Sequence, residues 1–342
     1  MHKYSLTRKV TLIALSVTEA EYKLISGTNM NRQAKDRLKV SLKKIHEWAR
    51  EDLLVRCDML TSYIVTGETI GIACNQIFKA GMNNIGKGLQ LATQHPYGPA
   101  SLDFVSGITQ MLIAEAILIQ KLAHTKESSI SNLDGTTHLM LCALATGRFE
   151  LVEPFHQAIF TGIHNGYGVS DGHNLPIGTT FRYAAFGLTI IGDWLGKPLD
   201  LDKHALPRDP AWGQLVAHWR EPDPDKLAPI LVAACDTHVE RIALTSRELD
   251  SGNFEFGSPF EAVYPAEILA ILNLRRSLGL TNPSPIEHPL MQTPYARLTC
   301  PPGMRFEPDE LLVQFLAAVC KHDPAAMPDG LYEAVLQTNS AN

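Results

Sequence analysis

The chain contains three stretches whose residue types and spacing are typical of catalytic or metal sites. The first is residues 168–172, Gly-Val-Ser-Asp-Gly, which match the G-x-S-x-G nucleophile elbow of α/β-hydrolases. In such an enzyme Ser170 would attack an ester carbonyl from a tight turn between a strand and a helix. Here residues 164–167 are turn-like, and Pro176 follows too soon for a helix. We therefore expect a glycine-rich loop, and an esterase that uses Ser170 is the alternative function.

The second stretch, residues 81–88, resembles a nucleotide-binding P-loop. Its last position holds Gly88, where a P-loop has the Ser or Thr whose hydroxyl holds Mg²⁺. No apolar strand leads into Gly81, although a P-loop requires one. The spacing favours a turn between two helices, and we expect no nucleotide cofactor.

The third stretch offers metal-ligand types at helical spacing. Cys235 and His238 are three residues apart, with Asp236 beside them, so that one ion could face both. Both also lie on the apolar stripe of the expected helix, where a packed thiol and a hydrogen-bonded core histidine are the usual arrangement. A looser set lies on the glycine-rich loop and consists of His164, Asp171 and His173. We expect no metal site and no catalytic residue.

Helices must position all of these residues, because the sequence pattern is helical almost throughout. Apolar residues recur at three- and four-residue spacing within 31–92, and a helix is expected over about 102–124. Residues 223–225, Asp-Pro-Asp, predict an N-cap and a first-turn proline for a helix through Ile242. Further helices are predicted over 266–278 and after the Pro-Asp-Glu at 308–310. Alternation with a period of two is scarce, so the fold class is all-α, multi-helix, with two helical subdomains.

The two predicted subdomains differ in charge. Residues 1–126 carry 16 Lys and Arg against 10 Asp and Glu, whereas residues 127–342 carry 14 against 26. The polar stretch 126–135 separates a basic N-terminal subdomain, residues 1–126, from an acidic one, residues 137–342. Acidic character suits docking onto a basic partner. A nucleic-acid-binding regulator that uses the basic residues within 32–56 is a third interpretation, although a solvated helix face explains them equally well.

Cysteine spacing and hydropathy bear on the compartment. None of the six cysteines forms a C-x-x-C pair, so we expect reduced thiols and no disulfide framework. The apolar stretch 10–17 is too short for a signal peptide and runs into acidic residues. We predict a cytoplasmic protein without a membrane partner.

Several segments of the C-terminal part together resemble a known group of proteins. Trp219-Arg220-Glu221-Pro222-Asp223 gives W-x-x-P-D, residues 236–238 give D-x-H, and Pro265-Ala266-Glu267-Ile268-Leu269-Ala270 gives P-x-E-[IL]-L-A, followed by Leu278-Gly279-Leu280. This pattern resembles the helical immunity proteins of bacterial polymorphic-toxin and type VI secretion systems, most closely the immunity protein 49 family. The immunity proteins that neutralise PoNe-type nuclease toxins are similar as well.

The resemblance implies a non-enzymatic, cytoplasmic, helical protein that binds a cognate toxin, usually a nuclease of the HNH or endonuclease VII type. It supplies no catalytic residue, cofactor or metal ligand. We expect the protein to block the toxin's active site or DNA groove without binding nucleic acid itself. Acids and interleaved phenylalanines are the candidate partner-binding residues: Glu221, Asp223, Asp225, Asp250, Phe254, Glu255, Phe256 and Glu261. In the alternative, the phenylalanines, with Phe260, cap the core and the acids are merely solvated.

Overall fold

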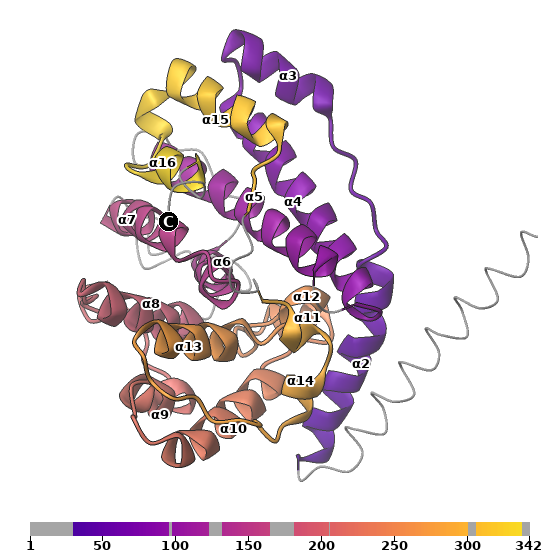
Figure 1. Ribbon diagram of the computed structural model, residues 1–342, viewed down its shortest axis with the longest axis vertical. Coiled ribbons are helices and arrows are strands. Elements are labelled where there is room, and N and C mark those ends of the chain that lie inside the picture. The colour runs from indigo at the N-terminus through magenta and orange to yellow at the C-terminus, as the bar shows by residue number, and fades with distance from the viewer. Residues whose placement is uncertain are drawn as a thin grey trace, which may run out of the picture.

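The computed structural model describes residues 30–95, 98–122, 132–164, 181–204, 206–299 and 306–336. These residues form α-helices, short 3-10 helices and one isolated β-bridge between Ile242 and Phe256, with no strand among them. The predicted all-α, multi-helix class is confirmed. Helices α3 and α15 lie at one end of the molecule, and α9 and α10 lie at the other (Figure 1).

The elements follow one another along the chain as α2 (Arg32–Trp48), α3 (Cys57–Thr66), α4 (Ile70–Ala92), α5 (Pro99–Leu122), α6 (Leu133–Ala145), η1 (Phe149–Leu151), α7 (Val152–His164), α8 (Arg182–Leu195), α9 (Pro210–His218), α10 (Pro224–Glu240), α11 (Ser246–Leu249), α12 (Pro259–Val263), α13 (Ala266–Ser277), α14 (Pro289–Gln292), η2 (Tyr295–Arg297), α15 (Glu310–His322), η3 (Pro324–Ala326) and α16 (Leu331–Leu336).

Helices α4 and α5 form a hairpin whose backbones touch at glycines. A Cβ atom on Gly107 would lie 2.5 Å from the carbonyl oxygen of Gly81, and one on Gly81 would lie 2.7 Å from that of Gly107. At the next contact, a Cβ atom on Gly88 would lie 2.8 Å from the oxygen of Ala100. The stretch 81–88 is therefore the interior of a continuous helix, and the predicted interhelical turn there is wrong. Gly81 and Gly88 let α4 and α5 approach each other closely, and Gly86 lets the carbonyl of Ala49 approach α4.

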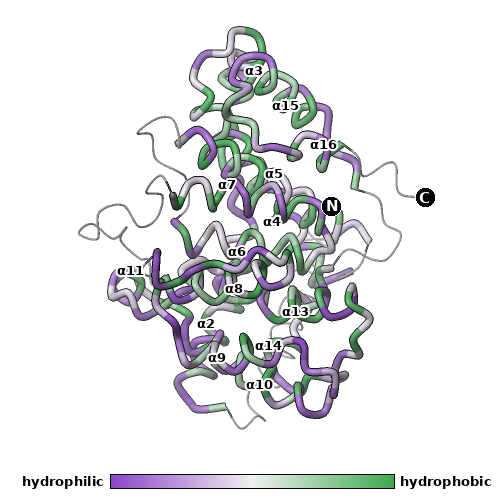
Figure 2. Tube along the Cα trace, turned by 90° about the vertical axis from the view of Figure 1, so that its left-hand side faces the viewer, coloured by the Kyte–Doolittle hydropathy of each residue, from purple (hydrophilic) through white to green (hydrophobic). Residues whose placement is uncertain are grey.

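The hairpin is central to the hydrophobic core. Helix α5 is the single described helix that is long and apolar enough to cross a membrane, and 83% of its most apolar window is buried within the fold. Figure 2 shows hydrophobic chain gathered around α4 and α5, whereas hydrophilic chain predominates near α11. Burial against other helices therefore accounts for the apolar composition of α5.

Sequence signals for the starts of three helices agree closely with the structure. Helix α10 begins at Pro224, with Asp223 as its N-cap, and α13 begins directly after Pro265. Helix α15 begins after Asp309, whose carboxylate accepts from the backbone N–H of Leu312. The capping and first-turn proline rules place these starts because unpaired N–H groups at a helix start need an acceptor.

Helices from both charge-distinct parts of the chain share one core. Helix α2 packs against α10 and α12, α3 packs against α15, and α5 packs against α6 and α7 (Figure 1). Arg37 on α2 is buried and donates to Glu248 with both terminal nitrogens, at 3.0 and 2.8 Å, as well as to the carbonyl oxygen of Ile242. Residues 123–131, at the proposed boundary, lie outside the described part, so the division into 1–126 and 137–342 stays a prediction.

Candidate partner-binding surface

Three of the candidate acids lie together where α9 turns into α10. Asp223 is the N-cap of α10 and its carboxylate accepts from the backbone N–H of Asp225 at 3.0 Å. The carboxylate of Glu221 accepts from the backbone N–H of Asp223 at 3.1 Å. Asp225 is exposed, and Glu221 and Asp223 are partly exposed. We call these three residues the acidic corner; its charges lie at a helix start, where the helix dipole favours anions.

Arg275 holds the acidic corner in place. Its guanidinium is fully buried and donates to the carbonyl oxygens of Trp219 and Glu221 at 2.8 and 2.7 Å. It also donates to the carbonyl oxygen of Thr281 at 2.6 Å and to the side chain of Asn282 at 3.0 Å. Desolvation lowers the pKa of Arg275 from its usual value. The planar fork of an arginine is suited to this set of acceptors, and it fixes the corner to α13.

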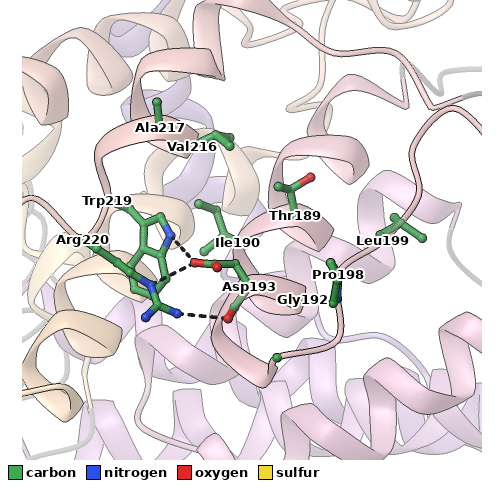
Figure 3. A pocket seen from close by; sticks show the side chains of 11 residues that line it. Thr189, Ile190, Gly192, Asp193, Pro198, Leu199, Val216, Ala217, Trp219 and Arg220 are labelled. Atoms are coloured by element: carbon green, nitrogen blue, oxygen red, sulfur yellow. Dashed lines mark hydrogen bonds and ion pairs between the residues drawn. The ribbon is translucent and has the colours of Figure 1, made fainter.

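A pocket of about 490 Å³ opens beside the corner, between α8 and α9 (Figure 3). Trp219 and Arg220 point toward Asp193 at the end of α8, and both donate to its Oδ2 atom, at 3.0 and 2.9 Å. Arg220 also donates to the carbonyl oxygen of Asp193 at 3.0 Å, and its guanidinium lies over the Trp219 ring. The hydroxyl of Thr189 donates to the carbonyl oxygen of Ala185. The polar side chains of this pocket are thus paired with neighbours, and none is arranged as a nucleophile beside a base.

The other candidate residues lie at the opposite end of α10. The segment after α10 folds back, so that the backbone N–H groups of Glu255 and Phe256 donate to the carbonyl oxygen of Arg241. Since α10 has 17 residues, the two groups are separated by about 25 Å along its axis at 1.5 Å per residue. The structure therefore does not bring all eight candidates into one patch.

Two of the candidates at this end have side chains that are buried in the fold. Phe256 is 1% exposed and its ring stacks on that of His238, with centroids 4.0 Å apart. Glu255 is also buried, with its Oε2 atom 3.8 Å from Nε of Arg241. Burial raises the pKa of Glu255 to about 8, although the charge of Arg241 opposes the shift. Phe256 therefore belongs to the core, and so does Phe260, which is 4% exposed. For these two residues the alternative interpretation is the correct one.

The remaining three candidates stay near the surface. Asp250 is exposed, and Phe254 is half-buried, with the Arg37 guanidinium 4.6 Å from its ring centroid. Glu261 is half-buried and forms a capping box at the start of α12. Its Oε2 atom accepts from the backbone N–H groups of Gly257 and Ser258, at 3.1 and 2.9 Å, and the hydroxyl of Ser258 accepts from its backbone N–H.

The D-x-H and P-x-E segments meet in a buried polar network. His238 lies on α10 with Nδ1 2.7 Å from Oε1 of Glu267 on α13, and its Nε2 lies 3.2 Å from the carbonyl oxygen of Ala262. The carbonyl oxygen of Ala262 can only accept, so Nε2 donates to it, and Nδ1 shares a hydrogen bond with the carboxyl group of Glu267. Tyr183 donates to the other carboxylate oxygen of Glu267 at 3.2 Å. Burial would raise the pKa of Glu267, but the charge and hydrogen bond of His238 outweigh it and lower that pKa.

This network decides between the two interpretations of His238. The histidine is a hydrogen-bonded core residue, as its position on the apolar stripe indicated, and Cys235 is buried beside it. Among the described residues no group of three or more His, Cys, Asp or Glu side chains is placed to hold a metal ion. The partner Glu267 was missed by the sequence analysis, although a lone acid in the near-continuous apolar run of α13 was an available signal.

Some sequence candidates lie outside the described residues. Ser170, Asp171 and His173 fall within 165–180, as does the whole G-x-S-x-G stretch, so the esterase alternative stays a prediction. On α2, Arg32, Lys43 and Lys44 are exposed as a solvated face requires. Arg37 departs from that face and points inward to Glu248.

Comparisons with models of known protein families, with curated protein sequences and with solved structures find no match to this chain.

Proposed function

We propose that this protein is an immunity protein that binds a cognate toxin of a type VI secretion or polymorphic-toxin system in the cytoplasm. The toxin class that fits best is a DNase of the HNH or endonuclease VII type, blocked at its active site or its DNA groove. The protein itself carries out no reaction. The observation that supports this most directly is the acidic corner of Glu221, Asp223 and Asp225, presented at the surface and fixed from behind by buried Arg275.

The physical argument begins with charge. A DNase must neutralise phosphates and therefore carries Lys and Arg around its groove. An acidic surface on the inhibitor steers encounter with such a groove and competes with DNA for the same cations. Arg275 already holds the backbone on both sides of Arg220. The acidic corner therefore loses little conformational entropy when a partner binds.

The segments that resemble immunity proteins contain residues that hold helices together. Trp219 of the W-x-x-P-D segment donates to Asp193, His238 of the D-x-H segment pairs with Glu267 of the P-x-E segment, and Arg275 follows that segment on α13. These residues join α8, α9, α10 and α13 to one another. The segments that carry the resemblance are thus packing contacts between helices. A packed helical scaffold of this kind favours a binding protein over an enzyme.

The test is recovery and reconstitution of the complex. The tagged protein is expressed in its native cells, and partners present in stoichiometric amounts are identified by mass spectrometry. We expect a basic protein with a nuclease domain, and we expect the purified chain to abolish its DNase activity at a 1:1 ratio. A stoichiometric partner whose nuclease activity is unchanged by the chain, or recovery of the chain alone, contradicts the proposal.

A further inference from the structure

A smaller cavity than the α8–α9 pocket lies against α12. It has a volume of about 150 Å³, and its walls come from α2, α4, α5, α6 and α12. Trp48, Met82, Met111 and Leu139 supply apolar walls, and Glu261 supplies a carboxylate. Trp48, Met82 and Glu261 are each only partly buried, so the cavity reaches the surface at these residues. A cavity of this volume holds a guest about as large as benzene.

The carboxylate of Glu261, which lines this cavity, can accept further hydrogen bonds. Its Oε2 atom is fixed by the backbone N–H groups of Gly257 and Ser258. Within the described ranges, Oε1 receives no hydrogen bond, and no Lys or Arg forms an ion pair with this carboxylate. His138 also lines the cavity, but burial lowers its pKa, so the ring is neutral at pH 7. The cavity therefore has one carboxylate that is paired with no Lys or Arg of the described ranges.

The aromatic wall is fixed in orientation. The ring of Trp48 stacks on that of Phe260, with centroids 6.1 Å apart and planes 18° from parallel. An indole face held in this way attracts a cation placed over it. The neighbouring thioethers of Met82 and Met111 are flexible and polarizable, so they adapt to an inserted chain.

We propose that this cavity takes a single arginine or lysine side chain from a partner protein as an anchor. The aliphatic stem of such a residue packs on the methionine wall, and its cationic head reaches Glu261 and the Trp48 ring. A wholly apolar side chain would leave the carboxylate desolvated without a partner, and that disfavours it. Identifying the partner as a basic toxin rests on the proposed function, whereas the cation preference rests on the cavity alone.

The experiment uses two ligands of the same shape and different charge. The purified full-length chain is titrated with n-butylguanidinium and, separately, with neutral N-butylurea, while the indole N–H signal of Trp48 is followed by NMR and assigned with Trp48→Phe. We expect saturable millimolar binding of n-butylguanidinium and binding of N-butylurea that is weaker by about tenfold. In Glu261→Gln the preference for the cation is lost, because glutamine keeps the capping box and removes only the charge.

A matched control is Glu287→Gln, which removes an exposed carboxylate that does not line the cavity and should leave both affinities unchanged. Equal affinities for the two ligands, no saturable binding of either, or a cation preference that survives in Glu261→Gln each overturn the proposal. These outcomes are independent of the toxin. A chain that inhibits a toxin yet binds neither ligand overturns the anchor cavity alone, and a chain that prefers n-butylguanidinium but inhibits no toxin overturns the proposed function alone.

Discussion

Nδ1 of His238 lies 2.7 Å from Oε1 of Glu267, and both side chains are completely shielded from solvent. The pair joins α10 to α13, and Tyr183 and the carbonyl of Ala262 occupy its remaining hydrogen-bonding positions. A buried ion pair offsets the cost of desolvation only when its surroundings are satisfied in this way. The contact therefore stabilises the packing of α10, which carries the D-x-H segment, against α13, which carries the P-x-E segment.

Removing the carboxylate from this pair should be strongly destabilising. Glu267→Ala removes the buried hydrogen-bond partner of both His238 and Tyr183, and we expect the free energy of unfolding to fall by about 3–5 kcal/mol. Urea denaturation followed by circular dichroism measures the loss. Glu287→Ala is the control, since that glutamate is exposed and should change stability by less than about 0.5 kcal/mol. A loss below about 1 kcal/mol in Glu267→Ala would show that this contact contributes little to stability.

Glu255 should make the protein less stable as the pH rises. Its pKa in the folded state is raised to about 8 by burial, from an ordinary value of 4.5. A carboxyl with a raised pKa favours folding below the unfolded pKa, and this contribution is lost as the pH rises through the folded pKa. Four charged groups act on it, namely Arg241 and Arg182, which lower its pKa, and Asp134 and Asp209, which raise it.

The comparison of wild type with Glu255→Gln isolates this effect. Relative to the variant, the wild type should lose up to about 5 kcal/mol between pH 4.5 and pH 8.5, at 1.36 kcal/mol for each unit of pKa difference. Urea midpoints measured at several pH values give the difference, and other titrating groups cancel between the two proteins. Parallel stability curves for the two proteins across this range would contradict the prediction.

Local signals in the sequence predicted the helices well, because caps and proline act within a few residues. Asp223-Pro224 and Pro308-Asp309 mark helix starts that depend on nothing distant. The prediction of a turn at 81–88 is wrong because these glycines answer to backbone that is distant in the sequence: Gly81 and Gly88 lie against α5, and Gly86 lies against Ala49. Periodicity alone does not reveal which helix will lie against another.

The candidate surface was predicted less completely than the helices. The spacing of Phe254, Phe256 and Phe260 is compatible with either a binding face or a core face, and only the fold-back of the chain onto Arg241 places Phe256 inside. The acidic corner was recognised from composition, whereas its support by Arg275 depends on a contact across more than fifty residues. The cavity beside Glu261 is built from five helices, so no local pattern could indicate it.

The close contact of α4 and α5 gives a prediction about glycine. In Gly107→Ala the new methyl group would meet the Gly81 carbonyl at 2.5 Å and the side chain of Ile85 at 2.7 Å. We expect a loss of about 1–3 kcal/mol from overpacking, which exceeds the gain in helix propensity. Gly213→Ala on α9 is the matched control, since nothing lies within 4 Å of its added methyl group. That variant should be stabilised by up to about 1 kcal/mol, and similar changes in both variants would argue against the close packing.

Arg275 should be irreplaceable by lysine. An ammonium group cannot reproduce the planar fork that reaches Trp219, Glu221 and Thr281 together, so Arg275→Lys leaves buried carbonyls unpaired. We expect a loss of about 2–4 kcal/mol and faster hydrogen exchange at residues 219–223. Arg276→Lys tests the neighbouring exposed arginine and should change neither quantity appreciably. Unaltered exchange at the corner in Arg275→Lys would mean that other contacts hold it.

Under the proposed function, the acidic corner should act on toxin association through its charge. The triple variant Glu221→Gln, Asp223→Asn and Asp225→Asn removes three charges, while asparagine still caps α10. We expect the association rate with the cognate toxin to fall by about tenfold at low salt, and the two rates to converge near 0.5 M salt, where charges are screened. Stopped-flow measurements over a salt series test this, with Asp200→Asn, Asp202→Asn and Asp329→Asn, all at exposed positions, as a charge-matched control. Equal rates and salt slopes in the corner variant and the wild type would place the toxin on another face.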